Sequence, residues 1–129
     1  MERQITVYFD PTTKLGRQAL ADAQASNAEV LGINILATNV TGTEWMKLAD
    51  GLGLDVLDLV HQDHPVFKNI YGNKKVNLSS NDALKILEKH PEVLVYPIAK
   101  RGDRYIQFKQ STDMRKLKEP DSKGTNLER

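Results

Sequence analysis

The opening of the chain most restricts its fold, because it has the pattern of a strand, a tight loop, a helix and a second strand. Residues 5–9, ITVYF, are rich in β-branched and aromatic side chains, and Asp10-Pro11 ends the run. From Lys14 onward apolar residues recur at helical spacing, and Thr12 or Thr13 supplies a capping oxygen. Residues 29–36 form a second apolar run. The sequence therefore predicts a β-α-β unit.

The middle of the chain, from residue 41 to residue 90, is predicted to be a helical insert. Thr41 and Glu44 have the spacing of a capping box. Trp45, the single tryptophan, lies on the apolar face of the helix that follows, so we expect it in the core. Further helices are expected over residues 54–61, 65–71 and 79–90.

After residue 92 the apolar pattern changes from the helical period to that of strands. Residues 93–99 and 104–108 are predicted strands, and the glycine-bearing segment 100–103 between them has the length of a hairpin turn. Residues 110–129 are mostly charged or polar and hold few large apolar side chains. We therefore expect one folded domain over residues 1–109 and a disordered charged tail over residues 110–129.

Composition excludes several classes of function. The 129 residues suit one domain, and 18 Lys and Arg against 17 Asp and Glu leave a net charge of +1, which argues against direct binding of nucleic acid. The chain has no cysteine, which excludes disulfides, thiolate nucleophiles and cysteine-bound metals. No signal peptide or membrane-length apolar segment is present. We therefore expect a cytoplasmic protein with no membrane partner.

Three local sequences, taken with the order of elements, resemble one family. Residues 7–17, VYFDPTTKLGR, are similar to a strand and active-site loop of the form YxNPxCSxSR. Residues 92–98, EVLVYPI, are similar to a strand ending in Arg-Pro-Ile, and residues 59–65, LVHQDHP, to a segment ending in Arg and then Glu-Pro. The chain thus resembles the glutaredoxin-type arsenate reductase (ArsC) and Spx family over residues 4–108. This resemblance implies an α/β, thioredoxin-like fold with a mixed four-stranded sheet and a helical insert.

The same resemblance implies that the family's chemistry is absent. Thr13 stands at the position of the catalytic cysteine, and Tyr96, His61 and Gln107 stand at those of the three oxyanion-binding arginines. Arsenate reduction in this family needs the thiolate and the arginines, so we expect no catalytic residue. The CxxC pair of redox-switching Spx proteins is also missing. Pro97 stands at the cis-proline of thioredoxin folds, so the resemblance implies a cis bond before it.

The loop of residues 10–17 is the predicted ligand-binding site. It enters a helix, where free amide groups and the positive end of the helix dipole attract anions. The residues predicted to bind a ligand are Thr12, Thr13, Lys14 and Arg17 from this loop, with Tyr96 and Pro97 from the late strand. The alternative is that the threonines only cap the helix while Lys14 and Arg17 are solvated.

Two histidines are candidate metal ligands. Asp58, His61 and His64 lie at intervals of three residues, a spacing that could gather side chains on one helix face around zinc. His64 precedes Pro65, however, and the residue before a proline is biased away from helical geometry. We therefore expect no metal site, and the sequence indicates no cofactor.

Three functions fit these features. The first is a non-redox, degenerate member of the arsenate reductase and Spx family that acts as a protein-binding or regulatory module. The second is an enzyme of another kind that binds a small anion or glutathione through residues 12–17. The third is an arsenate reductase-like oxidoreductase that takes its thiol from glutathione. The replaced family residues favour the first, with a protein as the partner.

Overall fold

The computed structural model describes residues 4–72 and 77–118, and within them four strands form one mixed sheet in the order β2-β1-β3-β4. The strands are β1 (Ile5–Phe9), β2 (Val30–Asn34), β3 (Ile98–Arg101) and β4 (Arg104–Gln107). Strand β1 pairs in parallel with β2 and antiparallel with β3, which pairs antiparallel with β4. The predicted mixed four-stranded sheet is confirmed.

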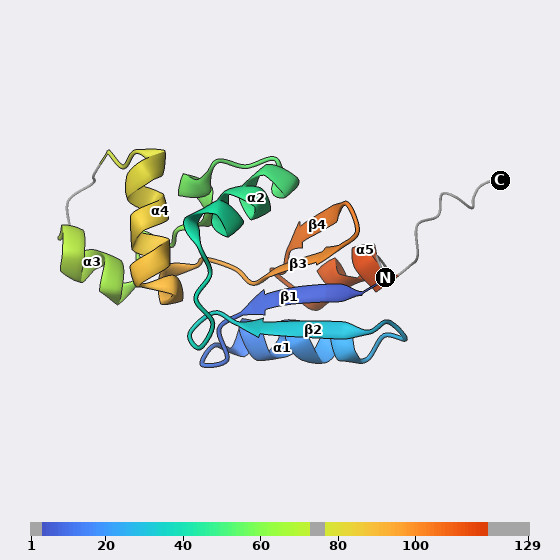
Figure 1. The fold of residues 1–129 in the computed structure, drawn as a ribbon. Helices are drawn as coiled ribbons and strands as arrows, with labels where there is room; N and C mark the ends of the chain where they lie inside the picture. Colours follow the sequence, from blue (N-terminus) through green and yellow to red (C-terminus); the bar gives the residue numbers. More distant parts are fainter. Residues whose placement is uncertain (1–3, 73–76, 119–129) are drawn as a thin grey trace.

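The central strand β1 supplies side chains to two cores, one on each face of the sheet. Because successive strand residues point to opposite faces, Ile5, Val7 and Phe9 pack with helix α1 (Lys14–Gln24). Tyr8 points to the other face, which helix α2 (Gly42–Leu52) covers. Figure 1 shows α1 on one side of the sheet and the helical insert on the other.

The helical insert packs mainly on itself. It contains α2, the short 3-10 helix η1 (Val56–Leu59), α3 (Pro65–Tyr71), α4 (Ser80–Lys89) and the 3-10 turn η2 (Pro91–Val93). Figure 1 shows α3 and α4 standing away from the sheet, while α2 lies between α4 and the hairpin. Trp45 is fully buried here, as predicted. In the described ranges no helix combines the length and apolar character needed to cross a bilayer.

Three predicted elements are shorter than expected. The helix predicted over residues 54–61 is limited to η1, after which Val60 forms an isolated bridge with Leu94. The strand predicted over residues 93–99 begins only at Ile98, because Pro97 has no N–H for the sheet ladder. The second strand covers five of the eight residues predicted at 29–36, and it pairs with β1 alone.

The prediction of a disordered tail is wrong for residues 111–118. They form the 3-10 turn η3 (Ser111–Met114) and helix α5 (Arg115–Lys118), which bury Met114 and Leu117 in the core shared with α1. Arg101 Nη1 donates to the carbonyl of Leu117 at 2.7 Å, and Arg104 Nη1 donates to that of Lys116 at 2.9 Å. The burial of these two side chains and the two arginine hydrogen bonds stabilise a segment that is otherwise mostly polar. Residues 119–129 of the predicted tail lie outside the described residues.

Candidate functional site

The loop between β1 and α1 is built around the hydroxyl of Thr13. This residue is the N-cap of α1: its Oγ1 accepts from the Gly16 amide at 2.9 Å and donates to the Asp10 carbonyl at 2.9 Å. Gly16 is needed because a Cβ there would lie 2.1 Å from the Asp10 carbonyl oxygen. The Thr13 hydroxyl therefore uses its proton and a lone pair to close the loop, as the capping alternative predicts.

The protein's own carboxylate occupies the loop beside the helix terminus. Asp10 is 9% exposed, and its Oδ1 accepts from the Thr12 amide at 2.8 Å and from the Thr12 hydroxyl at 2.6 Å. The Thr13 amide donates to the Asp10 carbonyl at 3.2 Å. Two of the three amides at residues 12–14 are thus satisfied internally. The Asp10 carboxylate accepts from the Thr12 amide, where an external anion would otherwise accept, and the Asp10 backbone carbonyl accepts from the Thr13 amide.

Lys14 and Arg17 differ in what they do. The Arg17 guanidinium donates to the Pro11 carbonyl at 3.0 Å, so it ties α1 back to the loop. The Lys14 side chain is exposed and lines a cleft next to the loop. Of the two predicted cationic contacts, only Lys14 faces this cleft.

The cleft has a volume of about 320 Å³, and its exposed lining surface is mostly apolar. Thr13, Lys14 and Leu15 form one wall, His61 and His64 come from the segment before α3, and Leu94, Val95 and Pro97 come from the stretch before β3. The structure thus places Thr13, Lys14, His61 and Pro97 around one cleft. Sequence reasoning missed Leu94 and the nearby Glu92, which only tertiary packing identifies.

Two of the predicted positions point elsewhere. The Lys109 ammonium lies 5.3 Å from the centre of the Tyr96 ring, in a cation–π arrangement outside the cleft lining. Gln107 lines a different hollow, shared with Lys109 and Asp113. Of the three positions that hold arginine in the family pattern, only His61 lines the cleft beside Thr13. The cis geometry implied for Pro97 stays a prediction.

The histidine spacing does not assemble a metal site. His64 Nδ1 accepts from the Val66 amide at 3.1 Å and so caps α3, while Asp58 accepts from the Asp55 amide at 3.1 Å to cap η1. The His61 and His64 rings lie edge to face with centroids 6.1 Å apart. Over residues 4–72 and 77–118 no group of three suitable side chains could hold a metal ion.

Among known proteins, this chain matches solved structures but no sequence family. No protein family model and no curated protein matches the sequence. Among solved structures, an arsenate reductase from Vibrio cholerae superposes with a TM-score of 0.74 at 19% identity, covering 84% of this chain and 92% of that one. This chain has the ArsC-type thioredoxin-like fold.

Further structures agree on that fold. A protein from Bacteroides fragilis whose name relates it to the ArsC family has a TM-score of 0.74 at 16% identity, covering 88% of this chain and 97% of that one. The protein SACOL0876 from Staphylococcus aureus has a TM-score of 0.68 at 17% identity, covering 87% and 96%. In this chain, residues of the loop after β1 and of the segment before β3 line one cleft.

Proposed function

We propose that this chain is a non-redox member of the arsenate reductase and Spx family that acts as a protein-binding or regulatory module. The observation that carries the proposal is the state of Thr13. Its hydroxyl stands where the family resemblance places the catalytic cysteine, and it is engaged in helix capping. The ArsC-type fold is therefore present, but Thr13 caps a helix and has no redox chemistry.

The chemistry of the loop supports the same conclusion. An attacking threonine needs a base to remove its proton, and this proton is directed at the Asp10 backbone carbonyl. Glutathione or an oxyanion would meet the Asp10 carboxylate rather than three arginines. The cleft beside the loop is lined mostly by apolar surface, which suits contact with a protein segment better than with a small anion.

The absence of reductase chemistry is tested with purified protein, arsenate, glutathione and glutaredoxin. We expect turnover equal to that of a control without the protein. Thr13→Cys introduces a thiol that labels with a thiol reagent, yet it should give no turnover because the arginine positions hold Tyr96, His61 and Gln107. Turnover by the unchanged protein, or family-like turnover by Thr13→Cys, would contradict the proposal.

The binding role is tested by site-specific photo-crosslinking in lysate from the source organism. A photoreactive side chain at Leu94 lies in the cleft, and the matched control is the same group at exposed Ile70 on α3. We expect a discrete adduct from the first position only, which Lys14→Glu abolishes. If neither position gives an adduct while glutathione or phosphate shifts the amide signals of residues 12–14, a small-ligand function replaces this proposal.

A further inference from the structure

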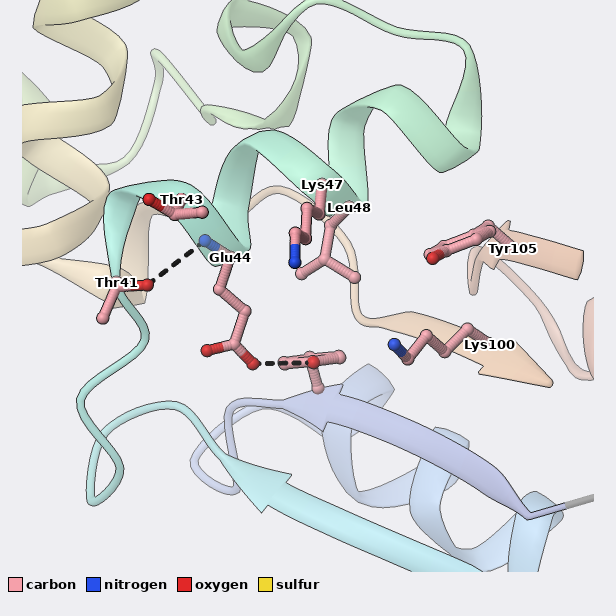
Figure 2. Close-up of a pocket in the computed structure, with 8 residues that line it drawn as sticks. Thr41, Thr43, Glu44, Lys47, Leu48, Lys100 and Tyr105 are labelled. Atoms are coloured by element: carbon pink, nitrogen blue, oxygen red, sulfur yellow. Dashed lines mark hydrogen bonds between the residues drawn. The ribbon is translucent and has the colours of Figure 1, made fainter. Parts of the chain in front are cut away.

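A second cavity, of about 370 Å³, lies between the sheet and helix α2 and shares no lining residue with the cleft beside Thr13. Its charged and tyrosine side chains come from four separate elements: Tyr8 from β1, Glu44 and Lys47 from α2, Lys100 from β3 and Tyr105 from β4. Figure 2 shows Glu44, Lys47, Lys100 and Tyr105 turned toward one common space. None of these residues takes part in the proposed protein-binding role.

Tyr8 and Glu44, which line the cavity, are hydrogen-bonded to each other. The Tyr8 hydroxyl donates to Glu44 Oε2 at 2.7 Å. Burial raises the pKa of the Tyr8 phenol above its ordinary value, and the hydrogen bond to Glu44 raises it further. Tyr8 therefore stays a neutral donor at physiological pH, and one oxygen of Glu44 is directed at it rather than at a lysine.

The cavity carries more positive than negative charge. Lys47 extends from α2 and Lys100 extends from β3. Figure 2 shows both ammonium groups pointing into the space between α2 and β1. Neither ammonium forms an ion pair with any residue in the described part of the chain. Two lysines against the single carboxylate of Glu44 leave an excess of one positive charge, and an anion placed between two ammonium groups is attracted by both.

The Tyr105 ring packs closely against Gly51 of helix α2. A Cβ at Gly51 would lie 2.5 Å from the Tyr105 ring, so α2 allows this close approach only because Gly51 has no side chain. Figure 2 shows the Tyr105 hydroxyl directed into the cavity, and the Lys100 ammonium lies 5.7 Å from its ring centre.

We propose that this cavity binds a small molecule that carries a phosphate group. Lys47 and Lys100 are the cationic contacts, and the Tyr105 hydroxyl is a hydrogen-bond donor to the same group. A phosphate ester carries close to two negative charges at neutral pH and offers several acceptor oxygens, which match two ammonium groups and a phenol. The cavity also reaches the range of roughly 300–1,000 Å³ found for small-molecule sites.

The test is an NMR titration of the full ¹⁵N-labelled chain with inorganic phosphate and, separately, with phenyl phosphate at constant ionic strength. We expect saturable shifts of amide signals in α2 and in the β3–β4 hairpin. Lys47→Met and Lys100→Met keep the aliphatic stem and remove the charge, so each should weaken binding about tenfold. Lys68→Met, an exposed lysine on α3, is the matched control and should bind as the unchanged protein does.

Several results would overturn the proposal: shifts that never saturate, an equal loss of affinity in Lys68→Met, or shifts confined to residues 12–14. Unfolding midpoints of the lysine variants show whether they fold normally. Tyr105→Phe supplies a second test, because it retains the ring against Gly51 and removes only the donor. Weaker phosphate binding by Tyr105→Phe supports the site, and unchanged binding removes Tyr105 from it.

Discussion

Individual polar residues in this protein take their roles from the groups that surround them. Thr13 faces a backbone carbonyl and a helix amide, so its hydroxyl is a cap. Tyr8 is 4% exposed and faces a carboxylate, so its phenol is a buried donor. Asp10 accepts from its own loop, so its carboxylate stabilises the turn. None of these roles can be read from residue type alone.

Thr13→Ala should destabilise the protein by about 1 kcal/mol, because the first turn of α1 loses its side-chain cap. Thr13→Ser keeps the oxygen and is the matched control, with an expected change below about 0.5 kcal/mol. Urea unfolding followed by far-UV circular dichroism measures both. Equal stability of the alanine and serine variants would show that the cap is not used.

Tyr8 should make stability depend on pH in the alkaline range. Its pKa in the folded protein is raised by burial and by Glu44, so above about pH 10 the unfolded chain releases this proton while the folded chain retains it. The stabilisation is complete below that pH and declines as pH rises. The stability advantage of the unchanged protein over Tyr8→Phe should therefore be constant at neutral pH and shrink as pH rises above about 10. An advantage that stays constant in urea unfolding would contradict this.

At the scale of elements, two contacts between segments far apart in sequence hold the hairpin in place. Helix α2 approaches β4 closely where Gly51 meets the Tyr105 ring. On the other face, η3 and α5 pack against α1 and the sheet, and Arg101 fixes the end of α5 by its bond to the Leu117 carbonyl. The β3–β4 hairpin thus packs against α2 on one face and against η3 and α5 on the other.

Gly51→Ala should destabilise the protein by about 1–3 kcal/mol, because the new methyl group overlaps the Tyr105 ring. In a Tyr105→Ala background the overlap is gone, and the same substitution should stabilise by about 0.5–1 kcal/mol through helix propensity. A double-mutant cycle by chemical denaturation measures the difference. Equal effects of Gly51→Ala in both backgrounds would contradict the contact.

Leu117→Ala should cost about 2–5 kcal/mol, because its fully buried side chain fills the core shared with α1. Arg115→Ala, at an exposed position of the same helix, is the control and should change stability by less than about 0.5 kcal/mol. Thermal or urea unfolding compares them. A disordered tail, as composition alone predicts, would make both substitutions neutral.

At the scale of the whole molecule, one strand joins two cores. β1 sends Ile5, Val7 and Phe9 to the core under α1 and Tyr8 to the core of the helical insert. If β1 left the sheet, both cores would be exposed to water, because both contain side chains of this strand. The cleft beside Thr13 and the cavity beneath α2 both adjoin this strand or the loop that follows it.

Unfolding should therefore be a single cooperative transition. The fluorescence of Trp45, the only tryptophan, reports on the insert core, and far-UV circular dichroism reports on both cores. We expect the two signals to give the same midpoint in urea. A fluorescence transition at lower urea would show that the helical insert unfolds separately from the sheet.

The sequence by itself determined the features that depend on neighbouring residues. The β-α-β order follows from local apolar periods, and the cap at Thr41 follows from a side-chain oxygen placed beside a helix start. For the first helix the sequence offered Thr12 or Thr13, and the structure uses Thr13. The absence of cysteine excludes a thiolate at the loop without any coordinates. These features were predictable because each interaction spans only a few residues.

Tertiary structure alone decided which distant residues meet. Local composition made residues 110–118 look disordered, yet Met114 and Leu117 bury themselves in a surface that α1 and the sheet create. Lys47 and Lys100 are 53 positions apart in sequence and share a cavity, whereas Tyr96 is adjacent to Pro97 and lies outside the cleft that Pro97 lines. The physical reason is that burial and charge proximity depend on the packing of whole elements, and no local period records that packing.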